Sequence, residues 1–133
     1  METVTEIRVR YSETDAMGIV YNANYLVWFE VARTELFRKL GLPYTRFEAE
    51  GLALAVVEAN LRYKAAARYD DVVELRAEVG EITPRKVVFD YQIACGEKLL
   101  CEGRTVHLFV NSEGRAVSAA RYEIWEEVRR IML

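Results

Sequence analysis

Histidine, cysteine, proline and glycine are all scarce in this sequence of 133 residues, which has one histidine, two cysteines, two prolines and seven glycines. With His107 alone and no Cys-x-x-Cys pair, the chain lacks the usual ligand sets for zinc and the Cys-His pair of a nucleophilic cysteine. We therefore expect no metal at the functional site. Cys95 and Cys101 flank a tight turn at Gly96-Glu97, where hairpin register separates them, so both are expected to be free, packed thiols.

Several signatures of hydrolase and nucleotide chemistry are also missing. None of the three serines lies in Gly-x-Ser-x-Gly, which excludes the strained turn that exposes a serine nucleophile. Neither Gly-x-x-x-x-Gly-Lys-Ser/Thr nor Gly-x-Gly-x-x-Gly occurs, so the usual phosphate-binding loops are absent. Lysine and arginine total 18 against 21 aspartates and glutamates, a net charge of −3, and this charge balance argues against nucleic acid as a partner.

Long apolar runs are lacking as well. The strongest ones, Leu52 to Val57 and Tyr25 to Phe29, are far shorter than the roughly 20 residues of a membrane-spanning helix. The N-terminus, Met1 to Glu6, carries acids where a secretory signal needs positive charge and an apolar run. We therefore expect no membrane span and a cytoplasmic location. The length, with 52% hydrophobic and 29% charged residues, suits one folded domain over residues 1–133.

The spacing of apolar residues predicts a strand, a long helix, four strands and a final helix. The long helix is apolar on nearly every side in its first half, so we expect its partners to bury it. Gly41 and Pro43 mark its end. The expected elements are a strand over 4–11, a helix over 23–40, a helical turn within 44–51, strands over 52–65, 71–82, 85–95 and 98–111, and a terminal helix that Ser118 would cap.

This order of elements predicts an α+β fold in which a curved antiparallel sheet wraps around one long central helix. Short connections at 66–70, 83–84 and 96–97 favour a meander in which successive strands are joined by hairpins. A single chain of this size covers only one face of such a sheet. We therefore expect two copies to pair along a sheet edge.

A carboxylate stands on a polar loop directly before the long helix. Asp15 lies in the loop over 12–18, which Gly18 ends. The free amides at the start of the helix point outward and, together with the helix dipole, can stabilise a carbonyl oxygen that becomes an oxyanion. A carboxylate beside such donors can attack an acyl carbon or draw a proton from water, and the sequence leaves both routes open.

The motif over residues 15–25, Asp-x-x-Gly-x-Val-Tyr-x-x-x-Tyr, resembles the signature of the hotdog-fold acyl-CoA thioesterases. It is similar in particular to the 4-hydroxybenzoyl-CoA thioesterase family and to the small acyl-CoA thioesterases associated with the Tol-Pal system. Supporting similarity continues in Ala-Arg-Thr-Glu over 32–35, in residues 59–63 and in residues 68–71. The resemblance thus extends over nearly the whole chain.

The resemblance implies a hotdog fold that hydrolyses an acyl-CoA thioester to free acid and CoA. It places Asp15 as the catalytic carboxylate and the backbone amide near Asn22 as the oxyanion donor. Tyr21 and Tyr25 would line the acyl end of the site, and Gly18 would join them among the substrate-binding residues. No cofactor is expected, because CoA is part of the substrate, and the chain is expected to be a homo-oligomer, either a dimer or a dimer of dimers.

Two positions depart from the family pattern. Many relatives resemble Asp-Thr-Asp and Tyr-His-Ala-Asn-Tyr, whereas this chain has Glu13 for the first acid and Asn22 for the histidine. These departures leave Asp15 to carry the chemistry alone. They also motivate the alternative of a non-catalytic acyl-CoA-binding or scaffold protein with the same fold. A hotdog dehydratase ranks last, because His107 is far in sequence from the loop.

Structural roles compete with the catalytic ones. Asp15 can cap the turn that follows it, and the side chains of Asn22 and Asn24 are expected to cap the helix. Trp28 is interpreted as a packing residue. His107 falls on the inward face of the last long strand, where a neutral, hydrogen-bonded imidazole is the default.

Basic residues gather at the corner after the second long strand. Arg85 and Lys86 follow Thr83-Pro84 there, in an otherwise acidic chain. The phosphates of CoA need such a group beside the mouth of the site. The competing interpretation is a solvated strand end.

Overall fold

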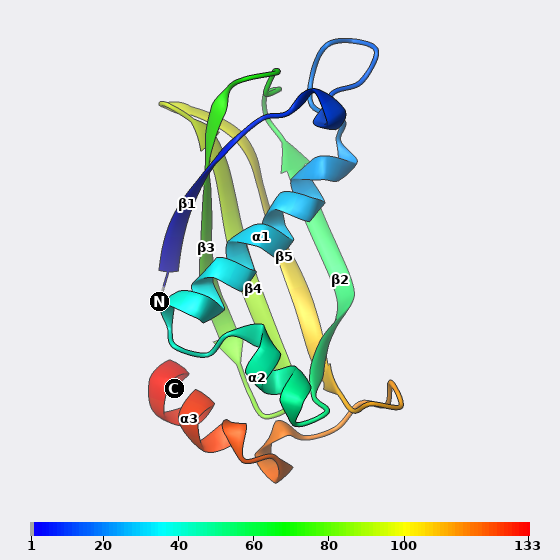
Figure 1. Ribbon diagram of the computed structural model, residues 1–133, viewed down its shortest axis with the longest axis vertical. Helices are drawn as coiled ribbons and strands as arrows, with labels where there is room; N and C mark the ends of the chain where they lie inside the picture. Colours follow the sequence, from blue (N-terminus) through cyan, green and yellow to red (C-terminus); the bar gives the residue numbers. More distant parts are fainter. Residues whose placement is uncertain (1) are drawn as a thin grey trace.

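The computed structural model describes residues 2–133 and contains a five-stranded antiparallel sheet, with the long helix lying across one of its faces (Figure 1). The strands and helices agree closely with those that the sequence predicts. Their bounds are β1 Glu2–Arg8, η1 Tyr11–Glu13, α1 Ala23–Lys39, α2 Tyr44–Ala49, β2 Ala53–Tyr63, β3 Val72–Ile82, β4 Lys86–Cys95, β5 Lys98–Val110, η2 Ala119–Arg121 and α3 Ile124–Met132.

The strand order β1-β3-β4-β5-β2 corrects one prediction about connectivity. β3, β4 and β5 form the expected meander, but β2 pairs with β5 instead of β3. The segment from Lys64 to Asp71 is therefore no hairpin. It crosses the end of the sheet, because Ala65 N–H donates to the Leu100 carbonyl (3.1 Å) and Ala67 N–H to the Tyr25 hydroxyl (3.1 Å). This crossing brings residues 64–67 over the beginning of α1.

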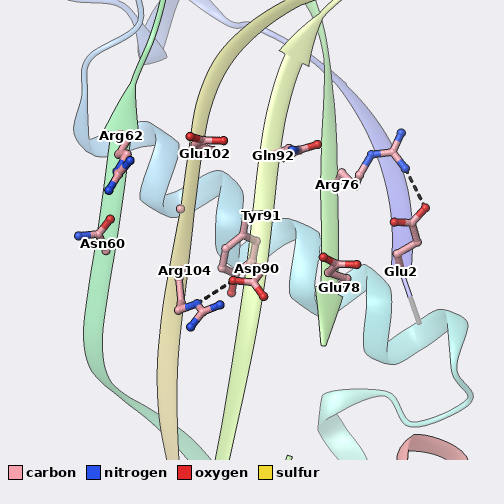
Figure 2. Close-up of a pocket in the computed structure, with 11 residues that line it drawn as sticks. Glu2, Asn60, Arg62, Arg76, Glu78, Asp90, Tyr91, Gln92, Glu102 and Arg104 are labelled. Carbon is pink, nitrogen blue, oxygen red and sulfur yellow. Dashed lines mark hydrogen bonds and ion pairs between the residues drawn. The ribbon is translucent and has the colours of Figure 1, made fainter. Parts of the chain in front are cut away.

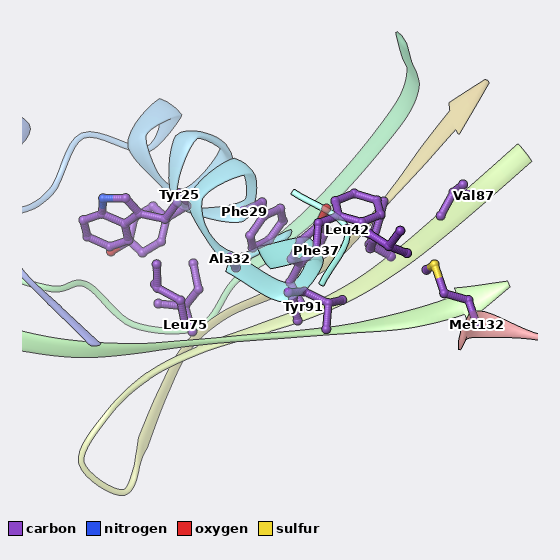
Figure 3. Close-up of a cluster of buried hydrophobic side chains, with 14 of the residues drawn as sticks. Tyr25, Phe29, Ala32, Phe37, Leu42, Leu75, Val87, Tyr91 and Met132 are labelled. Carbon is purple, nitrogen blue, oxygen red and sulfur yellow. The ribbon is translucent and has the colours of Figure 1, made fainter. Parts of the chain in front are cut away.

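Helix α1 approaches the sheet closely at one glycine. A Cβ on Gly103 of β5 would lie 2.7 Å from Phe29 of α1 and 2.3 Å from the carbonyl oxygen of Asn60. The bare backbone lets the Phe29 ring lie flat against Tyr91 of β4, with ring centroids 4.1 Å apart and planes 3° from parallel. Figure 3 shows this pair within the apolar cluster between helix and sheet. This contact helps to set how closely α1 approaches the sheet.

The composition of helix α1 led us to expect burial on nearly every side, but part of the helix is exposed. Leu26 is 40% exposed and Val27 is 50% exposed. The reason is geometric, because a single sheet covers only one side of a helix. On the edge strand β2, Val56 and Val57 are also exposed, at 47% and 56%. One chain alone therefore leaves apolar side chains in water on α1 and on β2.

The C-terminal part corrects the predicted cap. Ser118 accepts a hydrogen bond from Ala120 N–H (3.3 Å), which caps the short turn η2 and not helix α3. Helix α3 begins at Ile124, whose N–H donates to the Glu50 carboxylate at 3.2 Å. The bond to Glu50 ties α3 to the end of α2, and the α3 ring of Trp125 contacts Phe109 of β5 edge to face.

Two further expectations concern the cysteines and a membrane-spanning helix. Cys95 and Cys101 are free, and β5 pairs Cys101 with Ile93, so the predicted thiols are confirmed. No helix within residues 2–133 is long and apolar enough to cross a membrane.

Candidate active site

The loop that carries Asp15 is a narrow hairpin closed by backbone hydrogen bonds. Tyr21 N–H donates to the Glu13 carbonyl (2.8 Å), and Asp15 N–H to the Ile19 carbonyl (2.9 Å). At the tip, Gly18 N–H donates to the Asp15 carbonyl (3.0 Å), and Gly18 has a φ of +76°. Glycine adopts this left-handed conformation at no steric cost, so its place in the motif follows from the turn.

Glu13 anchors this loop to α1. Its side chain is buried and accepts hydrogen bonds from Arg10 N–H (2.8 Å) and from the Trp28 indole N–H (2.9 Å). Burial raises the pKa of Glu13, but the bonds from Arg10 and Trp28 outweigh it and hold the pKa below its ordinary value. Sequence analysis missed this contact. The only signal for it was a core tryptophan whose N–H needs an acceptor.

Asp15 is half-buried, and one of its oxygens remains free of protein donors. Oδ1 accepts Met17 N–H at 2.8 Å, which is the turn-capping contact expected from the sequence. Across residues 2–133, Asp15 joins no ion pair, and Oδ2 accepts no hydrogen bond from the protein. The carboxylate is thus oriented by one backbone bond while its other oxygen can reach a substrate or a water molecule.

The start of α1 leaves two backbone donors unused. Asn24 N–H donates to the Tyr21 carbonyl and Tyr25 N–H to the Asn22 carbonyl. Within the described chain, the N–H groups of Asn22 and Ala23 have no such acceptor. Free amides at a helix N-terminus carry partial positive charge and bind anionic oxygen.

The expected caps by asparagine side chains are absent. Asn22 has helical backbone angles, φ −56° and ψ −33°, and its side chain makes no cap bond. The Asn24 amide donates to the Glu13 carbonyl at 2.8 Å instead of accepting from the helix. Both asparagines therefore leave the first helical amides open, and Asn24 adds another tie between helix and loop.

A mainly apolar cavity of about 300 Å³ opens beside these amides. It lies between the start of α1, the end of β2 and the crossing segment. Tyr25 and Tyr63 form one wall, with their rings edge to face at 5.5 Å. Ile19, which holds Asp15 through the backbone, forms part of the rim. The full lining is Ile19, Val20, Asn22, Tyr25, Tyr63, Lys64, Ala65 and Ala66.

The structure gathers only some of the residues that the sequence singles out. Asn22 and Tyr25 line the cavity, and Asp15 is bonded to its rim. Tyr21 is 52% exposed and lies outside the lining, and Gly18 stands at the loop tip. Tyr25 is also a core residue, 2% exposed.

Arg85 and Lys86 lie at the opposite end of the sheet, where β4 begins beside η2 (Figure 1). Arg85 is exposed, and Lys86 pairs with Glu81 at 3.1 Å. The Asp15 loop lies at the other end of α1. Within one chain, these two cations and Asp15 are therefore separated by the length of the molecule.

His107 is fully buried, and one of its two ring nitrogens is hydrogen-bonded. Its Nε2 lies 2.8 Å from the Thr105 hydroxyl, which in turn lies 2.6 Å from the Tyr91 hydroxyl. Burial, aided by the charge of Arg33, lowers the pKa of His107 to about 4. The imidazole therefore carries no charge at neutral pH and belongs to the polar interior beneath α1.

A larger hollow, of about 470 Å³, lies on the outer face of the sheet, away from α1 (Figure 2). Side chains of both charges cover it, and two in-chain pairs, Arg76 with Glu2 (2.8 Å) and Arg104 with Asp90 (2.7 Å), cross it. It shares no residue with the cavity beside Asn22. Among the residues that the structure describes, no three His, Cys, Asp or Glu side chains gather closely enough to hold a metal ion.

Comparison with known proteins identifies the family. Residues 9–130 match the model of the thioesterase-like superfamily. The chain belongs to this superfamily. It is 41% identical over 110 residues to the putative acyl-CoA thioesterase YneP of Bacillus subtilis, with 81% of this chain and 79% of YneP covered.

Solved structures support the same assignment to the superfamily. A hypothetical protein, TT1821 from Thermus thermophilus, superposes with a TM-score of 0.90 at 40% identity, covering 100% of this chain and 99% of that one. The DHNA-CoA thioesterase of Staphylococcus aureus gives a TM-score of 0.91 at 32% identity, covering 97% and 89%. The predicted α+β hotdog fold is thereby confirmed.

Proposed function

We propose that this thioesterase-family chain hydrolyses acyl-CoA thioesters to free acid and CoA, with residues 1–133 forming one catalytic domain. The observation that carries the proposal is the half-free carboxylate of Asp15, whose backbone N–H bonds to Ile19 at the rim of the cavity that Asn22 lines. Relatives named for activity on CoA thioesters support the substrate class.

In this site the thioester carbonyl lies against the first amides of α1. As negative charge develops on its oxygen, the free N–H groups and the helix dipole stabilise it, and such donors act without reorganisation because the fold holds them in place. The apolar wall formed by Tyr25 and its neighbours excludes water, which strengthens these interactions. The chemistry needs water and the substrate alone, so we propose no cofactor.

Asp15 promotes attack on the acyl carbon by one of two routes, either as the nucleophile or as the general base. As a nucleophile, its oxygen bonds to the acyl carbon, the carbon–sulfur bond breaks, CoA leaves as a thiolate, and water then hydrolyses the mixed anhydride. As a general base, it takes a proton from the water molecule whose oxygen attacks that carbon. A single turnover in ¹⁸O water tests the nucleophilic route, because water that opens the anhydride at the Asp15 carbonyl leaves its ¹⁸O in Asp15.

A thiol-release screen tests the function. The purified chain is offered acetyl, medium-chain, long-chain and aromatic CoA esters, and free thiol is followed over time. We expect catalytic turnover of at least one ester. Saturable binding of the esters without release of CoA would instead support a non-catalytic acyl-CoA-binding or scaffold protein, the alternative that the departures at Glu13 and Asn22 suggest. The cytoplasmic location stays a prediction.

We further propose that the active form is a homodimer joined along β2. This edge strand has no neighbour on one side in the single chain, and Val56 and Val57 are exposed on it. Antiparallel pairing of two β2 strands places the beginning of one beside the end of the other. Because Ala53 at the beginning of β2 pairs with Val110 and Lys86 pairs with Leu108 on the same strand, Lys86 lies at that end.

In the dimer, Arg85 and Lys86 would therefore lie near an Asp15 loop, that of the second copy. These two cations of one copy would approach the cavity of the second copy, where they can bind the phosphates of CoA. The charged outer face offers a second contact that would turn two dimers into a dimer of dimers. Arg62 and Glu78 there take part in none of the ion pairs that residues 2–133 form, so each is free to pair with another copy.

A further inference from the structure

We propose that Tyr63 is a positioning residue, whose hydroxyl sets and polarises the first peptide of α1 for its role as oxyanion donor. The inference rests on the hydrolytic function proposed above. Tyr63 is the last residue of β2, and it lies 41 positions from the helix start along the chain.

The contact joins the edge strand to the helix. The Tyr63 hydroxyl donates a hydrogen bond to the Asn22 carbonyl oxygen at 3.0 Å. That oxygen also accepts helical bonds at the start of α1, among them one from Tyr25 N–H at 3.3 Å. Burial raises the pKa of Tyr63, so the hydroxyl keeps its proton at neutral pH and remains a donor.

Peptide geometry links this carbonyl to the proposed site. The Asn22 carbonyl and the Ala23 N–H belong to one planar trans peptide, in which the two groups point in opposite directions. Fixing the carbonyl therefore fixes the direction of the Ala23 N–H, which has no acceptor in the described chain. A hydrogen bond accepted at the carbonyl also makes the N–H of the same peptide a stronger donor.

Packing gives a weaker explanation for this tyrosine. Tyr63 is 52% exposed, so its ring buries limited apolar surface. Its ring forms part of the wall of the cavity beside Asn22, and its hydroxyl bonds to the Asn22 carbonyl at the helix start. A role in orienting the donor peptide uses both features of the residue, the ring at the wall and the hydroxyl at the carbonyl.

The experiment replaces Tyr63 by Phe and measures thiol release on the ester that wild type hydrolyses fastest. Without the hydroxyl, the donor peptide is less firmly held and its N–H is a weaker donor, so we expect kcat to fall about fivefold, the factor that corresponds to one neutral hydrogen bond. We expect KM, and the affinity for a non-hydrolysable thioether analogue of acyl-CoA, to change less than twofold. The uncharged carbonyl of the bound substrate interacts more weakly with the Ala23 N–H than the oxyanion of the transition state does.

Tyr44→Phe is a matched control. Like the Tyr63 hydroxyl, the Tyr44 hydroxyl bonds to a backbone group. It accepts Leu54 N–H at 2.8 Å, at the end of β2 far from Tyr63. Both variants lose one tyrosine hydroxyl and one bond to the backbone. We expect Tyr44→Phe to lose thermal stability comparably and to keep the kcat of wild type.

Three results would overturn the positioning role. Wild-type kcat in Tyr63→Phe, with Asp15→Asn inactive, would reject it and leave the hydrolytic function standing. Equal kcat losses in Tyr63→Phe and Tyr44→Phe would show a purely structural effect. Absence of turnover in wild type would remove both the function and the inference that rests on it. A kcat loss confined to Tyr63→Phe supports the proposal.

Discussion

Glu13 shows how one buried carboxylate orders the loop that carries Asp15. It accepts two N–H groups, from Arg10 and from the Trp28 indole, and its backbone carbonyl accepts two more, from Tyr21 and from the Asn24 side chain. Each bond ties a different part of the loop and helix to the same residue. The departure from the usual first acid therefore retains a carboxylate in an anchoring role.

Glu13→Ala tests this anchor. The substitution leaves the buried Trp28 N–H and the Arg10 N–H without acceptors, so we expect a loss of about 2–4 kcal/mol in the free energy of unfolding, measured with urea. Glu113→Ala removes the same charge from an exposed turn, where Glu113 pairs loosely with Arg115 at 3.8 Å, and should change stability by less than about 0.5 kcal/mol. Equal effects of the two substitutions would contradict the anchoring role.

His107 makes stability depend on pH. Because burial lowers its pKa to about 4, the unfolded chain binds a proton at higher pH than the folded one does. The contribution of the neutral imidazole is complete above the ordinary pKa near 6.5 and is lost as the pH falls toward 4. Between pH 7 and pH 5, we expect the wild type to lose about 2 kcal/mol more than His107→Gln in urea unfolding. Parallel pH profiles of the two proteins would exclude this origin.

At the scale of the elements, the approach of α1 to β5 depends on Gly103. An added methyl group there meets the backbone oxygen of Asn60 and the Phe29 ring, so we expect Gly103→Ala to lower the free energy of unfolding by about 1–3 kcal/mol. Gly80→Ala is the comparison, because its Cβ would clash only with the end of the Asp90 side chain, while the Val88 carbonyl at 3.6 Å is at ordinary contact distance, so it should cost less. Thermal or urea unfolding measures both, and a smaller loss for Gly103→Ala than for Gly80→Ala would refute the close-packing account.

The elements themselves could be read from the sequence, since alternation and helical spacing are local properties. The pairing of β2 with β5 could not, because the short connection after β2 also suits a hairpin. What decides the crossing is a set of distant bonds, such as that from Ala67 N–H to the Tyr25 hydroxyl, 42 residues away. Local turn chemistry likewise predicts the loop with Asp15 and Gly18, whereas the ties from Glu13 to Trp28 and from Tyr63 to Asn22 require the folded chain.

At the scale of the whole molecule, the exposed valines on β2 predict association. Val57→Lys places a charge on the proposed interface, and burying it there is costly. We expect this variant to be monomeric by light scattering at concentrations where the wild type is a dimer or larger. Val4→Lys provides the control, because Val4 is also exposed, at 44%, but lies on the opposite edge strand, β1. A monomeric wild type, or dissociation by Val4→Lys alone, would contradict pairing along β2.

The central claim is that the carboxylate of Asp15 performs hydrolysis at an acyl-CoA thioester. Asp15→Asn keeps the size of the side chain and an oxygen to accept Met17 N–H, so folding should be preserved. The most direct test is single-turnover thiol release by this variant, with bound acyl-CoA measured separately. We predict that binding and unfolding midpoint stay close to wild type while the rate falls by about a thousandfold or more. Release at the wild-type rate from Asp15→Asn would contradict the account.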